Sequence, residues 1–227
     1  AMHRRKVGKL DVVLGGAYRH EEDFRQGTFL KTGRANANLR YRIKDNMVVG
    51  VNSIFNPGVS RDYFYWDEKD SFLGDASSFN STDRLRFNVD PYFKWQSGNW
   101  SHKVLSRIYR TKNNVDNNQS NESWLTYGEY QTQYRLTELD MNIVGGAVVT
   151  NTNVSAELYS DTTFTNRNLA LYAQLEKKIF DQLTLSAGVR YEHNTLVVPE
   201  FFEGDTIANG EIIESRPVFR FGANYKT

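Results

Sequence analysis

Strict two-residue alternation is the feature that most constrains how this chain can fold. The segment 183–191 places apolar side chains at every second position, namely Leu183, Leu185, Ala187, Val189 and Tyr191. The segments 34–43, 84–95 and 219–225 follow the same rule. Because successive side chains of a strand point to opposite faces, this period is typical of strands with one apolar and one polar face. The sequence therefore predicts an all-β protein.

Weaker alternation extends the pattern to roughly ten strands, through 10–18, 47–55, 102–111, 124–136, 139–149 and 169–179. Short turns are expected at 44–46, 97–99, 137–138 and 180–182. Long polar loops are expected near 19–32, 57–82, 112–122, 158–167 and 197–214. Tight turns on one rim and long loops on the other are typical of outer-membrane barrels.

The lengths of the alternating runs favour the same class, since a tilted membrane-crossing strand needs about 9–11 residues. We therefore expect an antiparallel up-and-down transmembrane β-barrel wall. Aromatic residues near the ends of the runs fit the girdles at the two membrane interfaces, or alternatively an ordinary β-core: Tyr41, Trp95, Trp100, Trp124, Tyr134, Tyr191 and Tyr225.

Composition excludes several other classes. The 28 basic and 27 acidic residues give a net charge of +1, which argues against a nucleic-acid partner. There is no cysteine, and no apolar run is long enough for a transmembrane helix. A mean hydropathy of -0.61 looks soluble, but barrel strands and polar loops lower this average. The start AMHRRK leads into no signal peptide, so we expect a fragment.

Several stretches resemble the barrel of TonB-dependent outer-membrane receptors of the Bacteroidetes type. The most specific is the hairpin at 166–194, NRNLALYAQLEKKIFDQLTLSAGVRYEHN. Supporting stretches are the aromatic loop 64–66, the strand 88–93, the Asn-rich loop 113–121 and the closing strand 218–225. The resemblance covers most of the chain.

This resemblance implies a twenty-two-stranded barrel with an N-terminal plug domain, of which the chain shows about ten strands and no plug. We therefore expect 1–227 to be a single-domain segment of the barrel. The resemblance also implies active uptake of a siderophore, haem, a corrinoid or a glycan across the outer membrane. The implied partners are outer-membrane lipid, the small-molecule or glycan ligand, and TonB and the plug in the full-length protein.

Candidate ligand contacts come from the long loop 57–82 and the polar faces of the strands. The loop mixes aromatic and acidic residues, and the polar faces are basic, which suits plug carboxylates or an anionic substrate. The candidates are Tyr63, Tyr65, Trp66, Asp67, Arg84 and Arg86. The four histidines lie far apart in sequence, so we expect no metal site, and no motif indicates a cofactor or catalysis.

Two alternatives remain open from the sequence. One is a complete ten-stranded outer-membrane pore; an omptin-type protease of that strand count would need adjacent Asp-Asp or Asp-His pairs, which the chain lacks. The other is a soluble β-sandwich binding module, which only the mean hydropathy favours.

Overall fold

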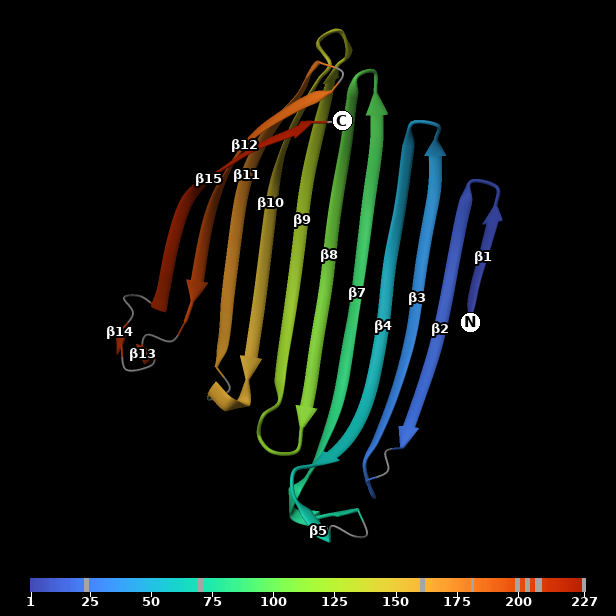
Figure 1. The fold of residues 1–227 in the computed structure, drawn as a ribbon, viewed down its shortest axis with the longest axis vertical. Coiled ribbons are helices and arrows are strands. Elements are labelled where there is room, and N and C mark those ends of the chain that lie inside the picture. Colours follow the sequence, from blue (N-terminus) through green and yellow to red (C-terminus); the bar gives the residue numbers. More distant parts are fainter. Residues whose placement is uncertain are drawn as a thin grey trace.

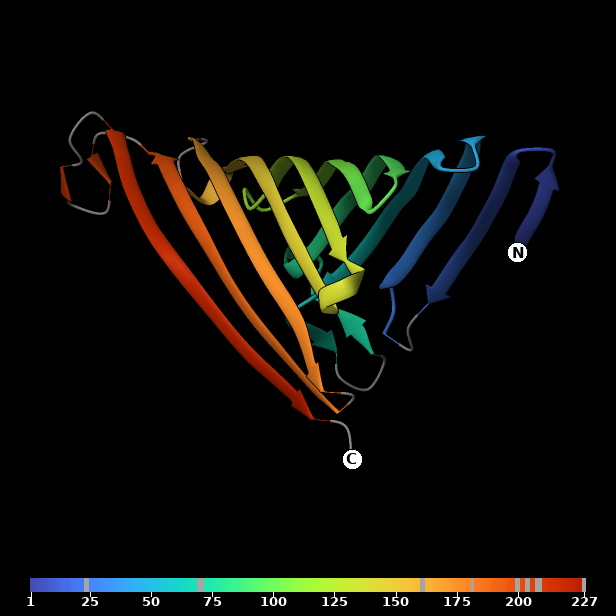
Figure 2. The same cartoon turned by 90° about the horizontal axis from the view of Figure 1, so that it is seen from above.

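A computed structural model of the chain describes residues 1–22, 25–68, 72–159, 162–180, 182–198, 201–202, 205–206 and 210–225. Eleven strands form one antiparallel sheet in which strands consecutive along the chain are neighbours, apart from small hairpins in two connections. Figure 1 shows these strands side by side, and Figure 2 shows that the sheet is strongly bent, like an open trough. Its edge strands, β1 and β15, are not paired with each other.

The sheet strands are β1 (Met2–Val7), β2 (Leu10–Glu22), β3 (Phe29–Lys44), β4 (Met47–Tyr63), β7 (Phe79–Ser97), β8 (Trp100–Val115), β9 (Asn121–Leu136), β10 (Met141–Ala156), β11 (Thr163–Phe180), β12 (Leu183–Val197) and β15 (Glu211–Tyr225). The small hairpins are β5 (Trp66–Glu68) with β6 (Leu73–Gly74), and β13 (Phe201–Phe202) with β14 (Asp205–Thr206). Three short 3₁₀ helices are η1 (Ala76–Ser78), η2 (Thr137–Leu139) and η3 (Glu157–Tyr159).

The strand register gives the sheet two chemically distinct faces. Residues directly opposite on neighbouring strands share a face, so one row can be followed from strand to strand. Tyr41, Val49, Phe93, Val104 and Tyr130 form such a row on β3, β4, β7, β8 and β9. We call the face that carries this row the apolar face, and the opposite one, with Asn38, Asn52, Asp90 and Arg107, the polar face.

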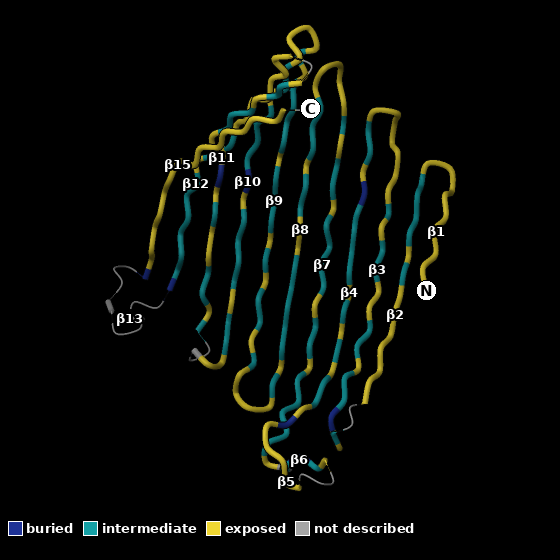
Figure 3. Tube along the Cα trace, viewed as in Figure 1, coloured by how far each residue is buried: buried dark blue, intermediate teal, exposed yellow. Residues whose placement is uncertain are grey.

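The sheet has almost no hydrophobic core. Among the described residues only Tyr63, Val148, Ala170 and Val198 are buried apolar side chains, and none of the larger side chains is fully buried. Figure 3 accordingly shows intermediate and exposed residues along nearly every strand. Many large side chains of the apolar face are exposed, with Phe221 reaching 80%. No second sheet or helix covers this face in the described part of the chain, which contradicts the β-sandwich alternative.

Two aromatic clusters lie on the apolar face, toward its two rims. At the rim with the short turns, the rings of Trp95 and His102 stack with centroids 4.5 Å apart, and Trp100 lies 4.5 Å from Tyr134. Toward the rim with the long connections, Phe87 meets Trp124 edge-on at 5.8 Å. Such bands are where membrane barrels place the headgroup interfaces.

The ten strands expected from alternation all form, but their limits differ. In the large sheet, the ten strands that follow β1 have 13 to 19 residues, because their ladders continue into segments expected to be loops. The expected loop 57–82, for example, narrows to the residues between Tyr63 and Phe79. Strand β1 was missed because Met2–Val7 is basic and does not alternate. Parts of the expected loops 19–32, 57–82, 158–167 and 197–214, and of the turn 180–182, lie outside the described residues.

Candidate functional site

The β4–β7 connection folds into a compact cap around one buried tyrosine. Tyr63, the last residue of β4, is 6% exposed, and its ring meets Trp66 and Phe79 edge-on at 5.3 and 5.6 Å. Its hydroxyl donates to the carbonyl of Phe72 over 3.2 Å. Gly74 lies directly against this ring, and a Cβ there would come within 2.3 Å of it. The cap is thus built on Tyr63.

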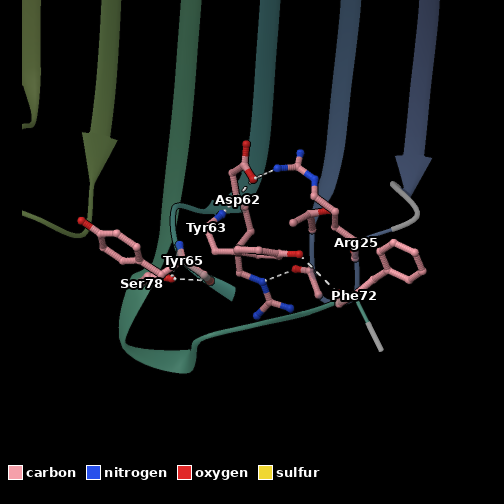
Figure 4. Close-up of polar contacts among 9 residues, drawn as sticks. Arg25, Asp62, Tyr63, Tyr65, Phe72 and Ser78 are labelled. Atoms are coloured by element: carbon pink, nitrogen blue, oxygen red, sulfur yellow. Dashed lines mark hydrogen bonds and ion pairs between the residues drawn. The ribbon is translucent and has the colours of Figure 1, made fainter. Parts of the chain in front are cut away.

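The β2–β3 connection is fastened to this cap, as Figure 4 shows. Arg25 forms an ion pair with Asp62 at 2.8 Å, and its guanidinium lies 5.6 Å from the centre of the Tyr63 ring. The backbone N–H of Gln26 donates to the carbonyl of Phe72 over 2.9 Å. These contacts join two connections that lie far apart in sequence into one surface, which we call the rim platform (residues 25–28, 62–68 and 72–79).

A cavity of about 700 Å³ opens beside the rim platform. Its walls include Arg25, Thr28, Phe29, Arg61, Asp62 and Glu22. Arg61 also donates to the carbonyl of Gly27 over 2.6 Å and lies 5.0 Å from the centre of the Phe79 ring. The walls carry both signs of charge, so the cavity suits a polar ligand without selecting its charge.

Four aromatic side chains of the platform face outward. Phe64 and Tyr65 are 74% and 70% exposed, and Trp66 and Phe72 are also exposed. Ser78 holds the Tyr65 backbone in place, since its Oγ accepts from the Tyr65 N–H at 3.2 Å and lies 3.3 Å from the Tyr65 carbonyl (Figure 4). Exposed rings on a fixed backbone are suited to stacking against a ligand.

Asp75 caps the short helix η1 next to these rings. Its carboxylate accepts hydrogen bonds from the backbone N–H of Ser77 at 2.8 Å and from the Ser77 hydroxyl at 2.9 Å. These bonds, the backbone one first, hold the pKa of Asp75 below its ordinary value of 3.8. The Asp75 carboxylate is therefore ionised at neutral pH. As the N-cap of η1, it stabilises the turn of the backbone at this point.

The structure places the six predicted contact residues in three settings. Tyr65, Trp66 and Asp67 lie on the exposed platform, whereas Tyr63 is buried beneath it and cannot meet a ligand without rearrangement. Arg84 and Arg86 lie on the polar face of β7, where Arg84 donates to the Ser60 hydroxyl, over 3.3 Å, at the cavity wall. Sequence reasoning missed Arg25 and Phe72, because nothing local indicates that the β2–β3 connection meets the cap.

Below the platform, the polar face carries an ordered hydrogen-bond network. Arg107 binds Asp90 through two bonds of 2.7 and 2.8 Å. Glu129 accepts from the hydroxyls of Tyr127 at 2.5 Å and Tyr172 at 2.6 Å. Among the described residues no group of three or more potential ligands could hold a metal ion. No helix in the described part of the chain is long and apolar enough to cross a membrane.

Comparison with known proteins gives the same architecture. The family described as TonB dependent receptor-like, beta-barrel matches residues 14–227. No curated protein sequence matches the chain significantly.

Three solved structures superpose well at low identity. FpvA of P. aeruginosa bound to heterologous pyoverdines has a TM-score of 0.75 at 12% identity, covering 97% of this chain and 36% of that one. The siderophore receptor PiuA of Acinetobacter baumannii gives 0.75 at 9%, covering 98% and 44%. The ferric yersiniabactin uptake receptor FyuA of Yersinia pestis gives 0.67 at 13%, covering 98% and 40%. The chain thus spans less than half the length of these structures.

The family match covers nearly the whole chain. A section of a large barrel wall requires an open sheet with one apolar and one polar face, and the eleven-stranded sheet has this form. This family consists of receptors, not enzymes, and its barrels lie in the outer membrane. The chain therefore belongs to the TonB-dependent receptor family, and its fold is that of a section of the receptor's β-barrel.

Proposed function

We propose that this chain forms part of the wall and outer rim of a receptor that takes up a scarce nutrient across the outer membrane. In this role the apolar face contacts lipid and the polar face lines the barrel interior. The plug domain and TonB act as partners in the full-length receptor. A Bacteroidetes-type outer membrane is the setting that the 166–194 hairpin favours.

The observation that carries the proposal is the exposed aromatic surface of the rim platform, which stands at the rim with the long connections. Tyr65 and Trp66 are exposed aromatic side chains, and the exposed Asp67 follows them with a carboxylate that can accept hydrogen bonds. In barrels the long loops lie outside the cell, so a ligand arriving from the medium meets this surface first. The rings contribute apolar contact area, while Arg25 and Asp62 beneath keep the backbone fixed.

A ferric siderophore is the ligand class that we favour among the nutrients implied by the sequence. The similar solved structures are named for such ligands: FpvA with iron-bound pyoverdine, FyuA with ferric yersiniabactin, and PiuA as a siderophore receptor. Iron chelates are large and often carry aromatic rings, which suits the exposed platform rings. Haem, a corrinoid and a glycan are the competing classes that binding experiments would separate.

The experiment compares a platform variant with a matched variant at the opposite rim. In the receptor that carries this chain, Tyr65→Ala together with Trp66→Ala removes two exposed rings. Phe180→Ala removes one equally exposed ring at the short-turn side. We expect the platform variant to bind its ferric siderophore on the order of tenfold more weakly, since exposed aromatic anchors dominate such contacts.

Binding is measured by equilibrium dialysis of radioactive iron chelates, and uptake by growth under iron limitation. Phe180→Ala is expected to match the unsubstituted receptor in both. Equal binding by the platform variant would exclude Tyr65 and Trp66 as ligand contacts. Growth on haem, a corrinoid or a glycan but on no iron chelate would overturn the siderophore proposal.

A further inference from the structure

A groove crosses the apolar face on three adjacent strands near the short-turn rim. It has a volume of about 600 Å³ and is lined by residues of β11, β12 and β15, which form one side of the trough in Figure 2. Most of its lining is apolar and includes Leu175, Leu185 and Phe221. The groove therefore lies on the side of the wall that faces away from the barrel interior.

Small side chains form the floor of this groove. Ala187 of β12 lies in register between Leu175 of β11 and Phe221 of β15. Ala223 is the next residue of β15 on this face toward the short turns. Because the two alanine methyl groups are short, the face is hollow between the larger side chains. Leu175 and Phe221 are both exposed, so the groove stays open along its length.

Of the described residues that line the groove, only Lys177 is charged. Its cross-strand neighbours are Met141 on β10 and Leu185 on β12, which are both apolar. Lys177 forms no ion pair with a described residue. The adjacent Glu176 belongs to the polar face, because successive side chains of a strand alternate. Within the described part of the apolar face, the Lys177 ammonium thus has no carboxylate partner.

Lys177 lies close to the end of its strand, where a barrel wall meets the lipid headgroups. It comes three residues before Phe180, the last residue of β11, and so lies within about 10 Å of the strand end. Lysines at such positions extend the ammonium toward the headgroups and keep the carbon stem in apolar surroundings. One row nearer the turn, the Tyr225 hydroxyl donates to the Gln182 side-chain oxygen over 3.0 Å. The groove therefore has a polar end and an apolar length.

A phospholipid matches both parts of the groove. An acyl chain fits the narrow apolar floor, and a phosphate is a suitable counter-ion for a lysine ammonium. A zwitterionic headgroup would also bring its own ammonium close to Lys177, where no described carboxylate can receive it. Charge complementarity therefore favours a headgroup with a net negative charge.

We propose that this groove is a specific site for an anionic phospholipid of the leaflet on the short-turn side. Lys177 binds the phosphate, and Leu175, Ala187 and Phe221 contact one acyl chain. The inference goes beyond the proposed function and rests on it only for the placement of the apolar face toward lipid. The bound lipid anchors this part of the wall at a fixed depth in the membrane.

The test is native mass spectrometry of the detergent-purified receptor that carries this chain. The probes are dioleoylphosphatidylglycerol, which is anionic, and dioleoylphosphatidylethanolamine, which has the same acyl chains and no net charge. Lys177→Gln removes the charge at the groove, and Lys177→Arg keeps it. Lys112→Gln is the matched control, because it removes a cation from the same face of β8 near the opposite rim.

We expect the unsubstituted receptor to bind the anionic lipid about fivefold more tightly than the zwitterionic one, as a partly exposed ion pair allows. Lys177→Gln should abolish this preference, whereas Lys177→Arg and Lys112→Gln should keep it. Equal affinity of the unsubstituted receptor for the two lipids would overturn the inference. A preference that survives Lys177→Gln, or one that Lys112→Gln abolishes equally, would also overturn it.

Ala187→Leu tests the apolar part of the site. The larger side chain fills the floor between Leu175 and Phe221, so we expect both lipids to bind about threefold more weakly through lost packing contacts, with the preference unchanged. Ala35→Leu, on the apolar face of β3, is the control. Unchanged affinity in the Ala187 variant would exclude the groove as the acyl-chain site. Receptor pairs that Ala187→Leu separates would identify the groove as a contact between two copies and overturn the lipid site.

The two proposals fail separately. If Tyr65→Ala with Trp66→Ala weakens siderophore binding while Lys177→Gln leaves the lipid preference intact, only the lipid site is wrong. If Lys177→Gln abolishes the preference while the platform variant binds its siderophore normally, the platform contacts are wrong and the lipid site stands.

Discussion

At the scale of single residues, two tyrosines lie over glycines of the neighbouring strand on the polar face. Tyr92 covers Gly50, and Tyr172 covers Gly146, where added Cβ atoms would come within 2.4 and 2.5 Å of the rings. A ring packed over a cross-strand glycine shields backbone that has no side chain of its own. In the second pair it also lets the Tyr172 hydroxyl reach Glu129, one strand beyond Gly146.

Gly146→Ala tests this packing. The new methyl group would push the Tyr172 ring away and break its bond to Glu129, so we expect a loss of about 1–3 kcal/mol in the free energy of unfolding. The matched control is Gly145→Ala, because a Cβ at Gly145 meets nothing closer than 3.6 Å. Urea unfolding in detergent, followed by intrinsic fluorescence, measures both. Equal stability of the two variants would contradict the packing role.

Asp75 gives a pH-dependent prediction for the rim platform. Its pKa is lowered in the folded chain, so the stability it contributes is present above its unfolded value and is lost as pH falls through the folded pKa. The carbon-13 carboxyl shift of Asp75 should therefore titrate below 3.8. Ser77→Ala should move the midpoint only part of the way back, because the backbone N–H of Ser77 still donates. A titration midpoint of Asp75 at or above 3.8 would contradict its role as the N-cap of η1.

At the scale of the elements, alternation predicted the ten long strands of the large sheet but not where they end. Alternation reports which segments have one apolar face, whereas strand pairing needs only backbone hydrogen bonds. The polar stretch from Asn56 to Arg61 therefore continues β4 although it carries little apolar signal. For the same reason alternation did not predict β1, whose basic residues Arg4, Arg5 and Lys6 pair in register with β2.

The candidate site could be predicted only in part. Local composition indicated the exposed Tyr65 and Trp66, but it could not distinguish them from Tyr63, which the cap buries. Arg25 lies 37 positions before Asp62, so their ion pair follows from the tertiary fold and not from a local pattern.

Asp62→Asn tests the connection between the β2–β3 segment and the platform. Losing the ion pair to Arg25 should free residues 25–28, so we expect about a threefold faster amide hydrogen exchange at Gln26 and Thr28, in line with a pair worth up to ~1 kcal/mol. Glu21→Gln removes the exposed pair with Arg19 and serves as the control. Unchanged exchange in the Asp62 variant would show that the backbone bond from Gln26 to Phe72 suffices.

At the scale of the whole molecule, stability has to come from outside the chain. The described residues form a single layer, and side chains such as Leu171, Val189 and Phe219 of the apolar face are more than 40% exposed. Burying apolar area is the main favourable term in folding, and here only lipid or detergent can cover that face. Backbone hydrogen bonds join neighbouring strands across the layer, whereas the outer edges of β1 and β15 have no neighbouring strand among the described residues.

We therefore expect the 227-residue chain to acquire β-structure only in detergent micelles or lipid. Far-UV circular dichroism should show a strand spectrum in detergent and none, or precipitation, in buffer alone. The free edges should also cause the detergent-solubilised chain to associate, which light scattering after size-exclusion chromatography would detect. A cooperative, monomeric β fold in plain buffer would contradict both expectations, because it would require the apolar face to be covered by the chain itself.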